Sequence, residues 1–299
     1  MSKKIVLTIA VFLLFLNIVC WGEVFTLAGP KYLQVDFLDV GQGDSAFIQT
    51  PGNHQILIDG GPDSTLLQKL SQRMPFWDKT IDLVILTHPE KDHMAGLLDI
   101  LKRYKVDNFL WTGIVKNDAE NKELALLLRQ AQEPKNYFLA GLVNSVPTRV
   151  ITSKAGEKIN VGNVVIDIIY PFEDLAGKDV KNTSNDTCVV SKIIYGESSF
   201  LFTGDISSVA EKQLVNSGEN ISADVLKVAH HGSKYSTSDL FISAVKPKIA
   251  VIEVGAKNTY GHPTPEVLQR LEKFGIKVFR TDKDGDVKFV SDGNTIKVN

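Results

Sequence analysis

The stretch THPEKDH, residues 87–93, places four potential metal ligands within six residues, directly after the apolar run DLVILT. That run predicts a buried β-strand ending near Thr87. The four side chains are His88, Glu90, Asp92 and His93. Imidazole nitrogens combined with carboxylate oxygens are the ligands that hydrolytic divalent metals use. We therefore interpret the stretch as a candidate metal site at the end of a strand.

Other polar side chains also follow apolar runs that predict strands. Asp205 follows SFLFTG, His230 and His231 follow DVLKVA, and His262 comes after KIAVIEVG, so that of six histidines only His54 lies elsewhere. A single histidine in a loop is commonly just a polar surface residue. Five gathered at strand ends indicate a shared site, because α/β proteins build their sites from the loops at those ends.

The spacing of the first motif suggests two metal ions. An extended segment directs His88 and Glu90 to one side, while Asp92 and His93 turn as a helix begins. Asp205, from another strand, is suited to bridge a pair of ions, a centre that hydrolyses esters and phosphoesters. Asp59 ends a further strand. We expect its carboxylate either to orient a metal-binding histidine through a hydrogen bond or to bind the metal itself only weakly.

The glycine-rich segment DVGQGDS, residues 39–45, invites comparison with a phosphate-binding loop. It lacks the lysine and the following helix that such a loop requires. We interpret it as a tight turn between two strands.

The rest of the chain alternates short strand-like runs with amphipathic stretches. Residues 116–133 predict a helix capped by Asn117 or Asp118. Gly162-Asn163 and Asp292-Gly293 each predict the turn of a hairpin. No internal repeat or Pro/Ser-rich linker divides the sequence, so we expect one mixed α/β domain over residues 24–299.

Residues 1–23 form a separate unit, with two lysines followed by an apolar run from Ile5 to about Val19. The run resembles a secretory leader, and an uncleaved membrane anchor fits it nearly as well. The remainder is therefore expected outside the cytoplasm, secreted or anchored, with membrane contact only through this segment. The formal net charge of −2 gives no overall basic field that would indicate a nucleic-acid partner.

Six motifs, in order, carry a family resemblance: FLDVGQGDSAFIQT, ILIDGG, LTHPEKDHMAG, LFTGD, KVAHHGS and YGHPTPEVLQRL. Together they resemble the metallo-β-lactamase superfamily, and within it the extracellular β-lactamase-like domain of ComEC-type DNA-uptake proteins. The resemblance covers about Leu33 to Val298 and implies a four-layer αββα sandwich.

The resemblance also implies roles for individual residues. His88 and Glu90 would bind one ion, Asp92 and His93 the other, with Asp205 between them and His230 as the later histidine ligand. The superfamily usually has histidine at position 90, and three carboxylates beside three histidines make manganese as credible as zinc. Asn185 stands near the position of a further histidine in many relatives and would be a weak ligand. Asp92, His231 and His262 are the candidate catalytic residues, the two histidines contacting substrate or protonating a leaving oxygen.

These features predict an extracytoplasmic hydrolase with two divalent ions, zinc or manganese. The leading hypothesis is a phosphodiesterase or nuclease that attacks DNA with metal-bound hydroxide. Hydrolysis of esters, lactones or small phosphodiesters is an alternative, because one fold supports many reactions. A non-catalytic binding module is another. The sequence predicts no oligomeric state.

Overall fold

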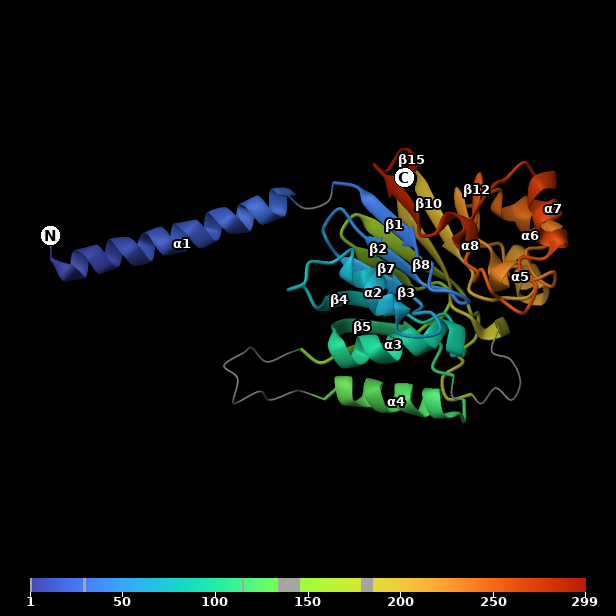
Figure 1. The fold of residues 1–299 in the computed structure, drawn as a ribbon, viewed down its shortest axis with the longest axis horizontal. Helices are drawn as coiled ribbons and strands as arrows, with labels where there is room; N and C mark the ends of the chain where they lie inside the picture. The colour runs from blue at the N-terminus through green and yellow to red at the C-terminus, as the bar shows by residue number, and fades with distance from the viewer. Residues whose placement is uncertain (1, 29–30, 115, 134–145, 179–184) are drawn as a thin grey trace.

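Two β-sheets packed face to face form the centre of the protein in this computed structural model, which describes residues 2–28, 31–114, 116–133, 146–178 and 185–299 (Figure 1). The first sheet has eight strands in the order β15-β14-β1-β2-β3-β4-β5-β6. Their bounds are β1 Leu33–Phe37, β2 Ala46–Gln49, β3 Gln55–Ile58, β4 Thr80–Ile85, β5 Lys105–Trp111, β6 Arg149–Thr152, β14 Val287–Ser291 and β15 Ile296–Val298.

The second sheet has seven strands in the order β13-β12-β11-β10-β9-β8-β7. Their bounds are β7 Lys158–Val161, β8 Val164–Tyr170, β9 Val190–Tyr195, β10 Ser198–Phe202, β11 Val225–Lys227, β12 Ile249–Ile252 and β13 Lys277–Arg280. The predicted hairpins are confirmed, because β7 pairs antiparallel with β8 and β14 pairs antiparallel with β15.

Apolar side chains from both sheets fill the space between them. Phe37 of β1 stacks on Phe202 of β10 with ring centroids 5.4 Å apart, and Phe289 of β14 lies edge-on to Phe200 of β10. All four rings are at most 2% exposed. Burying large apolar side chains on the inner faces is what holds two such sheets together.

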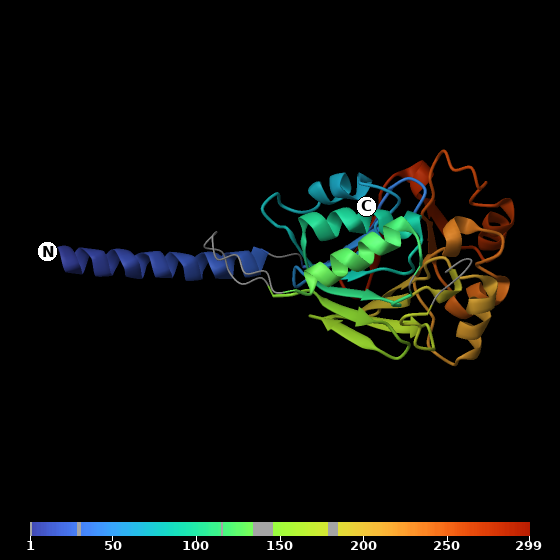
Figure 2. The ribbon, with the colours of Figure 1, turned by 90° about the horizontal axis from the view of Figure 1, so that it is seen from below.

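Helices cover the outer face of each sheet. The first sheet is covered by α2 Thr65–Ser71, α3 Lys91–Arg103 and α4 Ala119–Ala131, and the second by α5 Ser208–Asn216, α6 Asp239–Val245 and α7 Pro265–Lys273. The short helix α8 Thr281–Asp284 links β13 to β14. Figure 1 shows α2, α3 and α4 on one side of the strands and α5, α6 and α7 on the other, and Figure 2 shows the orange helices again apart from the green ones. The predicted αββα sandwich is confirmed.

The predicted cap of the helix over residues 116–133 is also present. Asp118 is the N-cap of α4, and its carboxylate accepts a hydrogen bond from the Asn121 amide. This contact satisfies one of the amides that a helix start leaves without an intrahelical partner.

Strand direction determines where a site can form. Strands β3, β4, β5 and β6 are parallel to one another, and β1 runs the same way because β2 is antiparallel to both β1 and β3. In the second sheet β10, β11, β12 and β13 are also parallel. The loops that carry the predicted ligands therefore leave the carboxyl ends of strands.

The N-terminal segment forms one long helix, α1 Lys3–Ala28, which extends away from the sandwich (Figure 1). Its residues Lys3–Trp21 are long and apolar enough to cross a membrane, and none of them is buried in the protein. The helix continues past residue 23, where we placed the end of the leader or anchor, and whether it is removed stays a prediction.

Candidate metal centre

Four buried side chains converge where the two sheets meet. Asp44, His93, Asp205 and His231 each offer one ligand atom, and these atoms all lie within 4.8 Å of one another. Two of the residues follow strands of the first sheet, and two follow strands of the second. A divalent ion about 2.0–2.2 Å from each donor fits such a cluster. The ligand atoms would therefore come from both halves of the sandwich.

Asp44 comes from the glycine-rich turn between β1 and β2. Its amide donates a hydrogen bond to the Asp92 carbonyl over 3.2 Å, which ties the turn to the start of α3. A Cβ on Gly43 would lie 2.2 Å from that same carbonyl oxygen, so only glycine permits this approach. The segment connects two strands as predicted, but residues 38–45 form a loop with a bend at 41–43 in place of a tight turn. The last acidic residue of this loop is brought into the centre.

His93 lies in the first turn of α3 and is held from behind. Its Nδ1 is 2.8 Å from Oδ2 of Asp59, which ends β3 and is 1% exposed. The second Asp59 oxygen accepts from the Thr87 amide at 2.7 Å, and the Thr87 hydroxyl donates to Oδ2 at 2.6 Å. Asp59 thus fixes the ring of His93 and leaves Nε2 directed toward Asp205. That this histidine binds a metal, with Asp59 orienting it, stays a prediction.

Asp205 and His231 follow β10 and β11. Asp205 Oδ2 lies 3.4 Å from His93 Nε2 and 3.6 Å from His231 Nε2, so it is the central member of the cluster. Nδ1 of His231 is 2.8 Å from the Glu253 carbonyl, and this contact fixes the imidazole from outside the cluster.

The backbone at the two adjacent histidines is left-handed. His230 has φ 51° and ψ 48°, and His231 has φ 52° and ψ 21°. This conformation is rare for residues other than glycine and is found at functional sites where the surrounding structure enforces it. It turns the chain sharply after β11, so that the buried member of the pair is His231 and the half-exposed member is His230.

A lysine is buried within the same cluster. Nζ of Lys227, in β11, forms an ion pair with Asp44, lies 3.7 Å from Asp205 Oδ1, and donates to the Gly204 carbonyl at 3.0 Å. Its side chain is 2% exposed. A fixed ammonium here offsets part of the negative charge that several buried carboxylates would otherwise concentrate.

The structure places two other residues of the THPEKDH motif beside this cluster and a third farther out. The His88 ring lies 4.2 Å from that of His93, centroid to centroid, and Asp92 Oδ2 is 3.3 Å from His231 Nε2. Glu90 caps α3, and its carboxylate is bound by Lys116 at 2.7 Å. The motif therefore delivers His93 to the four-residue cluster, keeps His88 and Asp92 beside it, and leaves Glu90 at the rim.

An open pocket of about 340 Å³ leads from the centre to solvent. His230 lies there with Nε2 3.8 Å from Asp205 Oδ2, and the Asn185 amide nitrogen is 3.4 Å from His230 Nδ1. His262 lies farther out, its ring 5.6 Å from that of His230, with Tyr260 stacked on it at 6.0 Å. These residues line the approach to the four-residue cluster.

The protonation of the histidines follows from their surroundings. Burial lowers the pKa of His88 to about 3, helped by the nearby charge of His93. Burial also lowers the pKa of His262, to about 4, with His230 adding to the shift. For His231 burial acts downward as well, but Asp205 and Asp44 outweigh it and raise the pKa to about 10. The buried carboxylates thus favour a cation at the centre.

The residues present fit divalent metal ions. Nε2 of His88, Nε2 of His93 and Oδ1 of Asp205 are buried without a hydrogen-bond partner in the described part of the chain. Buried polar atoms are normally paired, and unpaired ligand atoms that face one another are expected where an ion binds. The donor set of imidazoles and carboxylates suits zinc or manganese.

The sequence analysis did not select Asp44 or Lys227 as site residues. It selected His231 as a candidate catalytic residue and not as a metal ligand. Asp44 had a usable signal, because it follows a predicted strand just as Asp59 and Asp205 do. For the histidine pair, the sequence does not reveal the left-handed turn that decides which ring faces the centre.

Comparison with known proteins identifies the family. The profile of the metallo-beta-lactamase superfamily matches residues 38–255. ComE operon protein 3 of Bacillus subtilis is 31% identical over 86% of this chain and 33% of its own length, and competence protein ComA of Neisseria gonorrhoeae is 39% identical over 40% of this chain and 17% of its own. This chain thus spans a third or less of these relatives. The metallo-beta-lactamase fold protein YhfI of Bacillus subtilis has a similar fold, with a TM-score of 0.55, 15% identity, and coverage of 87% of this chain and 100% of YhfI.

These findings confirm the resemblance to competence proteins that the six motifs predicted. They agree with the two-sheet sandwich and with a polar centre at the carboxyl ends of its strands. The chain belongs to the metallo-beta-lactamase superfamily.

Proposed function

We propose that this protein is a metal-dependent phosphodiesterase that cleaves DNA outside the cytoplasm. The observation that carries the proposal is the convergence of Asp44, His93, Asp205 and His231, of which Asp205 and His231 line an open pocket. The similarity to competence proteins supports DNA as the substrate, and the apolar helix α1 supports a location at or beyond the membrane.

The four cluster residues would hold the metal, with His88 and Asp92 next to them to complete a second position. Divalent ions, when bound, supply Lewis acidity toward a phosphoryl oxygen and lower the pKa of water. Asp59 keeps His93 oriented through the 2.8 Å contact, and Lys227 keeps Asp44 in place through its ion pair. These buried contacts organise the centre before substrate arrives.

The pocket residues suggest how a phosphodiester would be bound. His262 has a pKa of about 4 and is therefore neutral near pH 7, which suits hydrogen bonding to a phosphate oxygen better than donation of a proton. His230 borders the same space from the side of Asp205. Tyr260 is 71% exposed and stacks on His262, where it offers an aromatic face to a base next to the scissile phosphate.

The test is cleavage of labelled single-stranded DNA by the purified full chain in detergent, with added manganese or zinc. We expect metal-dependent cleavage, and a loss of at least about 100-fold in Asp205→Ala, because removal of one metal ligand disables the centre. Asp239→Asn is the matched control, since Asp239 is half-exposed and pairs with Lys273 on the surface. This variant should cleave like the wild type.

Two results would contradict the proposal. Equal cleavage by wild type and Asp205→Ala would point to a contaminating nuclease. Absence of DNA cleavage together with hydrolysis of a chromogenic ester that requires Asp205 would move the assignment to ester substrates.

A further inference from the structure

The connection between α1 and the first sheet is short. The helix ends at Ala28 and β1 begins at Leu33. Five steps along the chain reach about 18 Å at most, at roughly 3.5 Å per residue. The apolar residues Lys3–Trp21 match the hydrocarbon core of a bilayer, and the helical residues beyond them add about 10 Å, the thickness of a headgroup layer. With α1 in a membrane, the start of β1 is held at the membrane surface.

One edge of the first sheet therefore faces that membrane. We call it the amino edge, the end of the sheet at which β1, β4, β5 and β6 begin, at Leu33, Thr80, Lys105 and Arg149. These strands all run the same way, so their starts lie together. The metal centre lies at the opposite end, about 26 Å away along β4 and the loop to His88, at about 3.3 Å per residue.

The amino edge exposes aromatic side chains. Phe76 and Trp77, just before β4, are 81% and 71% exposed, and their rings pack edge-on with centroids 4.8 Å apart. Tyr32, just before β1, is 51% exposed. In Figures 1 and 2 the segment between α2 and β4 projects from the side of the domain toward which α1 lies. Adjacent exposed aromatic residues indicate a surface that another phase or partner covers.

Basic side chains are present at the same edge, around the starts of β4 and β5. Lys79, Lys102, Arg103 and Lys105 are all exposed. Lys102 and Lys105 pair with carboxylates at 2.7 Å, whereas Lys79 and Arg103 form no ion pair with any residue in the described ranges. The acidic residue between Trp77 and Lys79 is directed inward, since Asp78 accepts from the Gln55 side chain and the Thr80 amide. Positive charge is therefore available at this edge.

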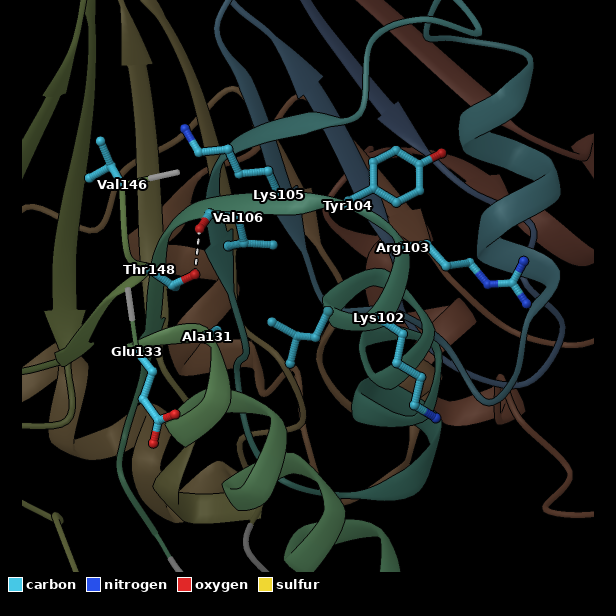
Figure 3. Close-up of a pocket in the computed structure, with 10 residues that line it drawn as sticks. Lys102, Arg103, Tyr104, Lys105, Val106, Ala131, Glu133, Val146 and Thr148 are labelled. Carbon is cyan, nitrogen blue, oxygen red and sulfur yellow. Dashed lines mark hydrogen bonds between the residues drawn. The ribbon is translucent and has the colours of Figure 1, made fainter. Parts of the chain in front are cut away.

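Figure 3 shows the basic residues following one another where α3 passes into β5. Lys102, Arg103 and Lys105 line a pocket of about 300 Å³ beside this junction, together with the acidic Glu133. Lys79 lies over the ring of Tyr104, 4.8 Å from its centroid. Amphipathic rings together with lysine and arginine are the composition of surfaces that lie in the headgroup region of a bilayer.

We propose that the amino edge rests on the surface of the membrane that holds α1. Phe76 and Trp77 lie among the lipid headgroups, and Lys79 and Arg103 face the phosphates of anionic lipids. The sandwich then stands upright on the bilayer, and its metal centre opens toward the aqueous phase. The proposal does not depend on the reaction that the centre catalyses.

The test uses the full chain carrying Trp21→Phe, reconstituted in nanodiscs of phosphatidylcholine and phosphatidylglycerol, one chain per disc. Two tryptophans remain, Trp77 at the amino edge and Trp111 at the far end of β5. Lipids with brominated chains quench tryptophan at short range. We expect them to reduce emission in Trp21→Phe and to leave emission unchanged in Trp21→Phe/Trp77→Phe, because Trp111 is too far from the bilayer.

Charge variants test the basic residues in the same background. Lys79→Glu/Arg103→Glu should lose most of the quenching. Lys234→Glu/Lys257→Glu, an equal charge change on exposed lysines of the loops after β11 and β12, should retain it. Quenching should also weaken in discs of phosphatidylcholine alone.

The proposal is overturned if brominated lipids quench Trp21→Phe and Trp21→Phe/Trp77→Phe equally or quench neither. The proposal is also overturned if the emission of Trp77 shifts to shorter wavelength but brominated lipids do not quench it. A protein surface, and not lipid, would then cover the ring. Unchanged circular dichroism shows that each variant is folded, and in Trp21→Phe/Trp77→Phe unchanged Trp111 emission shows the same. A loss of quenching in a folded variant then reports on contact with the membrane.

Discussion

His93 Nδ1 lies 2.8 Å from Asp59 Oδ2, with both side chains buried at the centre of the protein. Asp59 contacts the imidazole only at Nδ1, and this contact leaves Nε2 as the nitrogen available to a metal ion. We expect Asp59→Asn to weaken metal binding by about 10- to 100-fold, the usual effect of losing such a partner. Metal affinity measured by competition with a chelating dye would show this.

The chain supplies a matched control for that variant. Asp82 pairs with His54 at 3.1 Å, a second aspartate–histidine contact that lies outside the cluster. Asp82→Asn should leave metal affinity unchanged. A similar loss in both variants would show that Asp59 acts through general stability and not through His93.

Metal removal should lower the thermal stability of the protein. An ion that binds only the folded state at 100 times its dissociation constant adds about 2.7 kcal/mol to the free energy of unfolding. For a domain of this size that corresponds to a rise of about 5–10 °C in Tm. Differential scanning calorimetry with manganese and with chelator should show the difference in wild type, and Asp205→Ala should show none.

Replacing the buried lysine should have an effect that depends on metal. In Lys227→Met the carboxylates of Asp44 and Asp205 lose their fixed ammonium, and uncompensated buried charge costs about 3–5 kcal/mol. A bound divalent ion neutralises the same carboxylates, so the loss should shrink when metal is added. Urea unfolding with and without manganese measures both values.

Lys192→Met provides the comparison for Lys227→Met. Lys192 is 5% exposed, and its ammonium donates to the Asn220 carbonyl at 3.1 Å. It contacts no member of the metal centre, so its loss of stability should be the same with and without metal. If Lys227→Met behaved in this way, the lysine would have no role in balancing the charge of the centre.

The salt bridges of Asp286 predict how stability changes with pH. Burial alone would raise the pKa of Asp286, but hydrogen bonds from Lys69 and Arg73 outweigh it and hold the pKa below its usual value. A lowered folded-state pKa contributes stability that is complete above about pH 4 and is lost as pH falls through the folded-state pKa. Asp286→Asn should therefore be less stable at pH 7, and its stability should fall less on acidification.

Urea unfolding at pH 7 and at about pH 3 measures this contribution. Asp99 on α3 forms no ion pair within the described residues, and Asp99→Asn should keep the wild-type pH dependence. If the acid loss were the same in wild type and Asp286→Asn, the ion pairs of Asp286 would not be its source.

The pattern of apolar runs is sufficient to predict one mixed α/β domain, because alternating and continuous runs report which faces of the strands are buried. The four-layer sandwich is implied by the family resemblance of the six motifs. The pattern also indicates that polar residues after β4, β10 and β11 meet, since parallel strands bring their carboxyl ends to one edge. His93 and Asp205 lie in the cluster for this reason. Roles that depend only on the order of strands could thus be predicted from the pattern.

Roles that depend on local backbone geometry could not be predicted from the sequence. The choice between His230 and His231 is made by two consecutive left-handed residues, a conformation that nothing in the letters AHHGS requires. Asp44 reaches the centre only because Gly43 packs against the Asp92 carbonyl, a contact between segments 49 residues apart in the chain. Glu90 lines the same pocket as Asp92 but pairs with Lys116, a contact between residues 26 positions apart that the motif itself does not indicate.

The metal centre draws its four cluster residues from both halves of the sandwich, Asp44 and His93 from one and Asp205 and His231 from the other. A growing polypeptide cannot assemble this centre until residue 231 has been made and the second sheet has docked on the first. Every partial chain that ends before residue 231 consequently lacks the complete cluster during synthesis.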